Sequence, residues 1–478
     1  MSGPSRWQSA GSGLLLVGAL WALACGREGS PPPPAYQNLL VVMIDTLRSD
    51  HLPSYGYERD TAPFLHRLAA EGVQLQGYSA SSWTRPSVAT LLTGLHPERH
   101  QAIARSDGLP VAAPYLPALL KEHGFSTAAY VGNMNVGRKW GFDRGFDAFR
   151  QSRGARKVDA ARVTDWALAL ANETTGRYFL YAHYIDPHDP YQPRRPWGAR
   201  ENVPRASLLQ PDRFDHGRPF SAQDLARLRD AYDGEIREMD REIERLFEGL
   251  RSSGRLEGTL VLITSDHGEE FGEHGGLKHG RTLYEEVLRV PFILWASPAL
   301  GPRSTDHPFH QVDFLPTVLA ALGVRAPEAL DGEDRWAQVI DSQARDTGPL
   351  RFHLDLDQRG ALALFEPPWK LIHRTQAPHD ELFDLARDPA EENGWNVLDE
   401  RGKNLRRQLL DGYNALSADA FGRKIEVMDD ELREGLAALG YLQIDTPEEE
   451  LRERQLPPNL HPRRGLAQAP AAPAEEGR

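Results

Sequence analysis

The sequence of 478 residues contains a single cysteine, Cys25, so no disulfide bond can form within the chain. A surplus of basic residues is also missing, because 55 Lys and Arg stand against 68 Asp and Glu, and the formal net charge is −13. This balance disfavours a nucleic-acid backbone as partner, and we expect none. No internal repeat is visible. A hydrophobic content of 40% with 26% charged residues is typical of a globular protein, long enough here for more than one domain.

An apolar run at residues 13–24 follows Arg6 and precedes the cysteine, which is the pattern of a secretory signal. The run is too short for a comfortable membrane span. Residues 22–25 (ALAC) resemble a bacterial lipobox, in which the cysteine is lipidated and becomes the mature N-terminus. A plain signal peptide or a short anchor helix is the alternative. We therefore predict a lipoprotein signal peptide over 1–25, a membrane anchor through lipidated Cys25, and a location in the bacterial cell envelope, on the periplasmic side or at the outer membrane.

Composition divides the remaining chain into five parts. A proline-rich tether is expected over 26–37. Apolar strands that alternate with helices over 38–345 indicate an α/β fold, a doubly wound and mostly parallel sheet with helices on both faces. Residues 346–400 are expected to form a small C-terminal α+β domain. A helical tail over 401–445 and a disordered tail over 446–478, rich in Pro, Glu, Arg and Ala, complete the chain.

A continuous apolar run rich in β-branched residues, at 38–44, predicts a buried parallel strand. Further strands are predicted over 177–185, 259–264 and 290–296. Helices are predicted over 61–71 and over 225–250, where apolar residues recur in steps of three and four. In the C-terminal domain we expect a hairpin over 361–373, and a strand, turn and helix over 380–393.

Three of the predicted strands end in polar residues: Asp45 follows the first, His188 the second, and Asp266 with His267 the third. In such sheets the chemistry lies beyond the carboxyl ends of the strands, so these side chains are expected to share one site. Asp45, Asp266 and His267 suit one divalent cation, such as Ca²⁺, Mg²⁺, Mn²⁺ or Zn²⁺. For each residue alone, a helix cap or a turn is the structural alternative.

Residues 84–94 (TRPSVATLLTG) predict a helix with Pro86 in its first turn and Gly94 at its end. The start of a helix offers N–H groups and a positive dipole end to an anion. A hydroxyl nucleophile needs activation, which a metal can provide. Thr84 is therefore the candidate nucleophile and a further candidate metal ligand. Arg85 either binds the substrate anion or lies in solvent.

Histidines near these strand ends are candidates for protonating a leaving group and binding an anion. We predict His188 and His279 as proton donors, with Lys278 as the alternative to His279. His183 is a candidate substrate ligand, or else a core histidine, because it alternates with apolar neighbours. Lys278 is alternatively a solvated surface charge.

The motifs and their order resemble the sulfatase family of the alkaline-phosphatase-like superfamily over roughly residues 38–395. The matching stretches are 44–73, 84–94, 184–191, 264–275 and 283–293, extended by 311–323, 369–372 and 382–389. The resemblance implies a doubly wound catalytic domain with a small C-terminal sheet domain. It also implies one divalent metal on the three strand-end ligands, with the nucleophile as a further ligand and the histidines or lysine named above around the anion.

Two positions depart from the family pattern. Active sulfatases carry Cys or Ser in a Cys/Ser-x-Pro-x-Arg pattern and oxidise it to formylglycine, whereas residues 84–88 here are TRPSV. A threonine cannot give an aldehyde, because its β-carbon already bears a methyl group. Thr46 stands where many sulfatases have a second aspartate, so the site loses one carboxylate. Both departures resemble the Thr-dependent phosphodiesterase and phosphotransferase relatives in the superfamily.

A threonine ester must be released by attack of water on the transferred group, which is easier for a phosphoryl group stabilised by a metal. We therefore predict a hydrolase of sulfuric or phosphoric esters, with phosphoric esters favoured and a sulfated or phosphorylated glycan or lipid as substrate. The alternatives are a phosphotransferase onto an envelope glycan or lipid, and a catalytically inactive anion-binding lipoprotein.

Overall fold

The computed structural model describes residues 36–152, 157–193, 221–341, 348–356, 359–375, 377, 379–426 and 428–438. The predicted signal peptide with Cys25, nearly all of the tether and the tail from 446 lie outside these ranges, so those expectations stay predictions. Across the described ranges, no helix is both long and apolar enough to cross a membrane.

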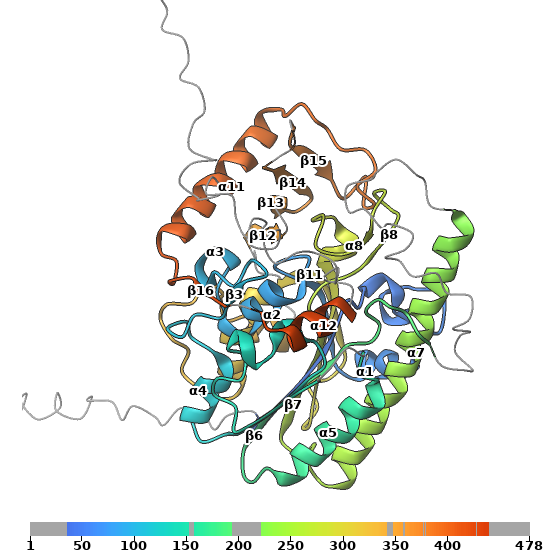
Figure 1. Ribbon diagram of the computed structural model, residues 1–478, viewed down its shortest axis with the longest axis vertical. Coiled ribbons are helices and arrows are strands. Elements are labelled where there is room, and N and C mark those ends of the chain that lie inside the picture. The colour runs from blue at the N-terminus through green and yellow to red at the C-terminus, as the bar shows by residue number, and fades with distance from the viewer. Residues whose placement is uncertain are drawn as a thin grey trace, which may run out of the picture. The chain divides into compact units, whose positions relative to one another are not determined.

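An eight-stranded sheet in the order β11-β2-β10-β7-β1-β6-β4-β5 forms the centre of the fold (Figure 1). Its strands are β1 (Asn38–Ile44), β2 (Val73–Tyr78), β4 (Ser126–Val131), β5 (Ala148–Gln151), β6 (Tyr178–Tyr184), β7 (Thr259–Ser265), β10 (Arg289–Ala296) and β11 (Arg303–His310). Five neighbouring pairs are parallel, whereas β10 runs antiparallel to both β7 and β2. The mixed, mostly parallel sheet confirms the predicted fold class.

Helices cover both faces of this sheet. In Figure 1, α5 (Ala160–Glu173) and α7 (Ala222–Ser252) lie on one side of it, and α2 (Thr84–Thr93) and α4 (Leu116–Glu122) on the other. Further helices are α1 (Pro63–Glu71), α3 (Pro97–His100), α8 (Glu285–Leu288), α9 (Phe314–Ala321) and α10 (Trp336–Asp341). Short 3-10 helices are η1 (Ser49–His51), η2 (Pro53–Tyr55), η3 (Met134–Val136), η4 (Arg138–Trp140) and η6 (Gln311–Asp313). Every residue of β1, β6 and β7 is buried, which explains why these strands are mostly apolar. The apolar stripe of α7 is buried as well.

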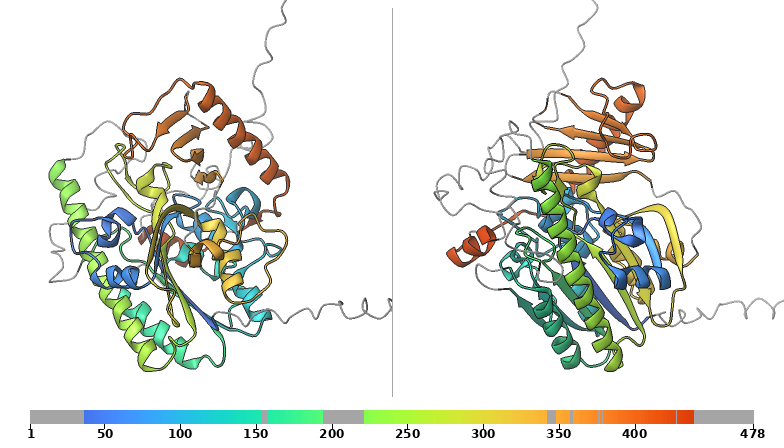
Figure 2. Two further views of the ribbon diagram at one scale, coloured as in Figure 1. Left: turned by 180° about the vertical axis from the view of Figure 1, so that it is seen from behind. Right: turned by 90° about the vertical axis from the view of Figure 1, so that its right-hand side faces the viewer.

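A second, antiparallel sheet forms the small C-terminal region and lies beyond one end of the central sheet (Figure 2). Its strands, in order, are β12 (Leu350–Leu356), β13 (Arg359–Glu366), β14 (Trp369–Arg374) and β15 (Glu381–Asp384). Leucines on one face pack against α11 (Glu400–Ala418). The other face packs in one cluster with Trp83 and Tyr284. The small sheet therefore supports Trp83, the residue directly before Thr84.

The structure departs from two expectations for the C-terminal part. Residues 385–393 form turns rather than a helix. Pro389 lacks a donor N–H, and the Asp388 carboxylate accepts from the N–H groups of Glu392 and Asn393, which competes with helical hydrogen bonds. The predicted helical tail is also divided. Between α11 and α12 (Asp430–Ala438), strand β16 (Lys424–Ile425) pairs with β3 (Asp107–Gly108).

Candidate active site

Asp45 directly follows β1 and is fully buried at the carboxyl end of the central sheet. Its Oδ2 accepts a hydrogen bond from Nδ2 of Asn133 at 2.6 Å and lies 3.3 Å from Nε2 of His183. Its Oδ1 is buried without a hydrogen-bond partner. Burial, and then the nearby carboxylate of Asp266, raise the pKa of Asp45 well above its ordinary value. Such a carboxylate is stabilised by a cation.

Asp266 and His267 follow β7 and are fully buried. The Oδ1 of Asp266 accepts from the backbone N–H groups of Thr46 at 3.1 Å and His267 at 3.0 Å. Its Oδ2 is buried without a hydrogen-bond partner and lies 3.4 Å from Nε2 of His267. The Nδ1 of His267 lies 2.9 Å from the carbonyl oxygen of Gly268. A carbonyl only accepts, so the proton is on Nδ1 and the lone pair is on Nε2, toward the site.

Thr46 links these two strand ends in a strained conformation. Its φ of 57° lies in the left-handed region, which is rare for a β-branched residue. The hydrogen bond from its N–H to Asp266 and one from the Tyr232 hydroxyl to its carbonyl, at 2.7 Å, hold it there. Its hydroxyl is buried without a hydrogen-bond partner. Strain of this kind is typical of functional sites.

Helix α2 begins at Thr84, and the residue before it, Trp83, is extended. Thr84 Oγ1 lies 3.3 Å from Nε2 of His267 and accepts a hydrogen bond from Nδ2 of Asn133 at 3.2 Å. Asn133 therefore connects the hydroxyl with the Asp45 carboxylate. The helix ends at Gly94, which has a φ of 65°, as the sequence predicts. The start of the helix thus presents a hydroxyl and a positive dipole end to the strand-end acids.

These residues fit a divalent metal ion. Two buried carboxylates each have an oxygen without a hydrogen-bond partner, and Nε2 of His267 lies 3.4 Å from that oxygen of Asp266. Candidate ligand atoms of Asp45, His183 and Asp266 lie within 4.8 Å of one another. His183, predicted as a substrate ligand, therefore lies with the predicted metal ligands. Burial lowers the pKa of His183 to about 4, so its ring is neutral near pH 7 and suits a metal.

His279 lies between two other histidines of the site. Its ring centroid is 4.4 Å from that of His267 and 5.0 Å from that of His188. Its Nδ1 lies 2.8 Å from Oε1 of the buried Glu269, so the Nδ1 proton is donated to this carboxylate. Burial, and then the neighbouring His267, lower the pKa of His279 well below its ordinary value. The hydrogen-bonded pair of His279 and Glu269 resembles in its geometry the histidine–carboxylate pairs of hydrolases.

His188 follows β6, and its Nδ1 contacts the carbonyl oxygen of Asp189. The Nδ1 proton is donated there, which again leaves Nε2 as the acceptor of the neutral ring. Burial, and then His279, lower the pKa of His188 well below its ordinary value. Lys278, the alternative proton donor, forms an ion pair with Asp189 at 2.9 Å and has a φ of 71°. Its charge is already compensated, so the geometry favours Lys278 as a residue that positions the His188 loop.

Arg85 lies outside the group around Thr84. It is fully buried, with its guanidinium 3.6 Å from the ring centroid of Trp140. Its Nε and Nη1 donate to four backbone carbonyls, those of Ala104, Arg105, Asp107 and Asn135, at 2.7 to 3.0 Å. These contacts give Arg85 a structural role, and we do not retain it as a substrate ligand.

The sequence analysis missed Asn133 and Glu269. Asn133 follows β4, whose small residues (STAAYV) do not form the long apolar run that marks the other strands. Glu269 stands within the strand-end motif, two residues after His267, but a single glutamate in a loop gave no signal of its own.

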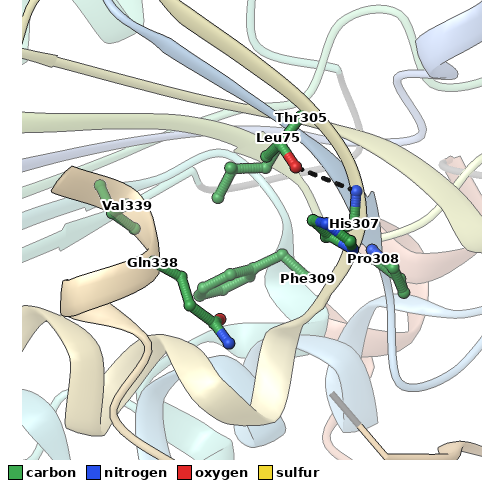
Figure 3. A pocket seen from close by; sticks show the side chains of 7 residues that line it. All are labelled: Leu75, Thr305, His307, Pro308, Phe309, Gln338 and Val339. Carbon is green, nitrogen blue, oxygen red and sulfur yellow. Dashed lines mark hydrogen bonds between the residues drawn. The ribbon is translucent and has the colours of Figure 1, made fainter. Parts of the chain in front are cut away.

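A pocket elsewhere in the described residues contains none of these side chains. It lies at β11 and α10 (Figure 3). Its lining residues are Leu75, Thr305, His307, Pro308, Phe309, Gln338 and Val339.

Comparison with known proteins places the site in a family. The family model for sulfatases matches residues 37–324, and that for the C-terminal part of N-sulphoglucosamine sulphohydrolase matches residues 272–418. The N-acetylgalactosamine-6-sulfatase of Rattus norvegicus is 28% identical over 79% of this chain and 84% of its own length. The choline-sulfatase of Rhizobium meliloti is 24% identical over 74% of this chain and 81% of its own length.

Solved structures share the fold. The phosphonate monoester hydrolase of Agrobacterium radiobacter has a TM-score of 0.67 at 19% identity, over 80% of this chain and 95% of its own. A protein in complex with its substrate D-glucosamine-2-N,6-O-disulfate has a TM-score of 0.66 at 19% identity, over 80% of this chain and 99% of its own. The chain therefore belongs to the sulfatase family of ester hydrolases, whose members typically bind a divalent metal ion.

Proposed function

We propose that this protein is a metal-dependent hydrolase of sulfuric or phosphoric esters with Thr84 as its nucleophile. The observation that carries the proposal is the position of Thr84 Oγ1, at the start of α2 and 3.3 Å from Nε2 of His267. The hydrogen bonds of Asn133 to Thr84 and to Asp45 bring this hydroxyl to the buried acids.

Asp45, Asp266 and His267 are the proposed metal ligands, with Thr84 and His183 as further ones. When bound, a divalent ion would lower the pKa of the Thr84 hydroxyl and offset the charge of the substrate anion. Asn133 fixes the direction of the Thr84 oxygen. The N–H groups and dipole at the start of α2 stabilise the negative charge of the transferred group.

The positions of the side chains support the following reaction. Thr84 Oγ1 loses its proton to solvent and attacks phosphorus or sulfur; the bond from Oγ1 forms and the bond to the ester oxygen breaks. His279 or His188, neutral in the free protein, takes up that proton at Nε2 as the substrate anion binds, gives it to the departing oxygen and becomes neutral again. Water then attacks the transferred group and gives a proton to the same nitrogen. The Thr84 oxygen leaves and takes this proton back through solvent, which restores the neutral histidine, and inorganic phosphate or sulfate is released.

Glu269 supports His279 in this role. Its carboxylate accepts from Nδ1 of His279 and also from the hydroxyl of Tyr191 at 3.0 Å. It therefore holds one tautomer and offsets the imidazolium charge after a proton is taken up. We assign the acid–base role to His279 before His188, because Nδ1 of His279 faces the carboxylate of Glu269, whereas Nδ1 of His188 contacts a neutral carbonyl.

Phosphoric esters are the favoured substrates. A threonine ester has no aldehyde-hydrate route for release, so water must attack the transferred group, which suits phosphoryl transfer. Among solved structures with this fold are phosphonate monoester hydrolases of Agrobacterium radiobacter and Silicibacter pomeroyi, which supports this choice. The substrate would be a phosphorylated or sulfated glycan or lipid of the cell envelope, reached from a membrane anchor on Cys25.

The test compares hydrolysis of chromogenic phosphate monoesters, phosphate diesters and sulfate monoesters by the chain from residue 26, with metal added back. The parent is compared with Thr84→Ala and with the matched control Thr93→Ala. Thr93 is a hydroxyl at the other end of the same helix, bonded to the helical carbonyl of Ala89. We expect phosphoester turnover in the parent and control, lost in Thr84→Ala. Turnover that survives Thr84→Ala would contradict the mechanism. Metal-dependent anion binding without turnover would favour an inactive anion-binding protein.

A further inference from the structure

A second group of potential metal ligands lies in the hairpin that follows the active-site motif. Strand β8 (Glu270–Phe271) pairs with β9 (Leu277–Lys278), and α8 follows. Glu270 comes from β8, His274 from the connecting loop and Glu286 from α8. One candidate ligand atom from each lies within 4.8 Å of the other two. None of the three belongs to the active-site group around Thr84.

Glu270 is the most buried member of this group. It is 1% exposed, its Oε1 accepts from the N–H of Gly276 at 3.0 Å, and its Oε2 is buried without a hydrogen-bond partner. A Cβ at position 276 would lie 2.7 and 2.8 Å from the two carboxylate oxygens of Glu270. Only glycine at this position therefore leaves room for the carboxylate. Burial, and then the charge of Glu286, raise the pKa of Glu270 to about 7. A buried carboxylate of this kind needs a proton or a cation.

The imidazole of His274 faces two acceptors. Its Nε2 lies 3.2 Å from the carbonyl oxygen of Glu391, which places a proton on Nε2. Its Nδ1 lies 2.7 Å from Oε1 of Glu286. With its proton on Nε2, a neutral ring would point the Nδ1 lone pair at this carboxylate, and the two would repel each other. A second proton on Nδ1, or a metal ion bound by both groups, removes this repulsion. The carboxylate of Glu273 adds further negative charge near Glu270.

We propose that Glu270, His274 and Glu286 bind a second divalent metal ion of the Zn²⁺ or Mn²⁺ type. Two carboxylates and one imidazole suit such ions, whereas Ca²⁺ takes six to eight oxygen ligands. The ion would join the β8–β9 hairpin to α8. His274 also stacks on Tyr284, with ring centroids 3.6 Å apart, and Tyr284 packs with the small sheet. The site is structural, and it holds the hairpin that carries Lys278 and leads into His279.

The experiment counts bound metal in the full chain. Zn²⁺ is added, unbound ion is removed by gel filtration, and metal per chain is measured by mass spectrometry, with circular dichroism to check folding. The double variant Asp45→Asn, Asp266→Asn removes the active-site ion. We expect it to retain one Zn²⁺ per chain and to lose that ion when Glu270→Gln is added. Glu273→Gln is the matched control, because Glu273 lies in the same hairpin but pairs with Arg48; this change leaves the ion bound.

A folded double variant without zinc above background would overturn the proposal and show that a proton on His274 fills the cluster. Retention of the ion after Glu270→Gln would overturn it as well. If the double variant does not fold, the parent and the single variant Glu270→Gln decide. A loss of one Zn²⁺ per chain supports the second site, and equal content contradicts it. Neither comparison depends on Thr84 or on ester turnover, so failure of the proposed function would not affect the result.

Discussion

Replacement of Arg85 by alanine should destabilise the whole fold and leave substrate affinity unchanged. Arg85 directly follows the proposed nucleophile in the sequence, a position from which a cation could bind a substrate anion. Its hydrogen bonds instead run to carbonyls of the segment 104–107 and of Asn135, and its guanidinium stacks on Trp140. The variant would leave these carbonyls without their donor in the interior.

The size of the effect follows from the contacts. Nε–H and the two Nη1–H groups can satisfy about three carbonyls at once, and a hydrogen bond to a charged group contributes roughly 1.5–3 kcal/mol. The contact with the Trp140 ring contributes roughly 1–2 kcal/mol more. Water entering the space would recover part of the sum, since such contributions are not additive. We therefore expect Arg85→Ala to lower the free energy of unfolding by about 4–6 kcal/mol.

Urea unfolding followed by tryptophan fluorescence gives this loss, and steady-state kinetics on the best ester substrate give kcat and KM separately. Arg85→Lys should recover only a small part of the stability, because an ammonium cannot reproduce the planar fork of donors. Arg138→Ala is the control, since Arg138 is an exposed arginine that pairs with Asp143. A stability change below about 1 kcal/mol, together with a raised KM in Arg85→Ala, would refute the structural role and restore Arg85 as a substrate ligand.

Three further outcomes are expected. A chelator should lower the Tm of the parent, because the metal stabilises the native state, and should lower that of Asp45→Asn less; equal shifts would count against Asp45 as a ligand. Burial lowers the pKa of His353, but the Glu98 carboxylate at 3.3 Å outweighs it, so the folded pKa lies above the ordinary 6.5; in turn the pKa of Glu98 is lowered to about 2. The pair therefore stabilises fully between about pH 4.5 and 6.5; the stability is lost above 6.5 as His353 deprotonates, and below 4.5 as Glu98 is protonated. His353→Gln should flatten the alkaline fall in Tm, and an unchanged slope would exclude the pair as its cause. Gly280→Ala should reduce both stability and kcat, since Gly280 has a φ of 71° and an added Cβ would lie 2.7 Å from a leucine carbon. Gly275→Ala is the control: Gly275 has a φ of 79° but open space around it, so this change should lower the free energy of unfolding by only roughly 1–2 kcal/mol. Equal effects of the two changes would rule out the contact at Gly280.

The strand-end residues could be predicted because their signal is local. Strands β1, β6 and β7 are buried along their whole length; Asp45 and Asp266 directly follow β1 and β7, and His188 lies in the loop after β6. Parallel neighbours in a sheet bring such positions together whatever the loops between them do. The helix α2 could also be predicted from local residues, because a proline lies in its first turn and a glycine follows its last.

The side-chain partners could not be read from the sequence. Arg85 and Asn135 are 50 positions apart, and Asn133 reaches Asp45 across 88 positions. Whether a charged side chain points to the site or into the interior depends on where such distant segments pack. His183 shows the same limit, because alternation with apolar neighbours fits a core histidine and a metal ligand alike, and only the position of the Asp45 carboxylate distinguishes them.

The most direct test of the central claim is to find the covalent threonine ester. The chain from residue 26 is mixed with a slowly released ester substrate and metal, quenched in acid within one turnover, digested, and analysed by high-resolution mass spectrometry. The account predicts a peptide with one phosphoryl or sulfonyl group on Thr84, absent in Thr84→Ala and in metal-free protein. Turnover at full rate by Thr84→Ala, with no modified threonine in the parent, would contradict it.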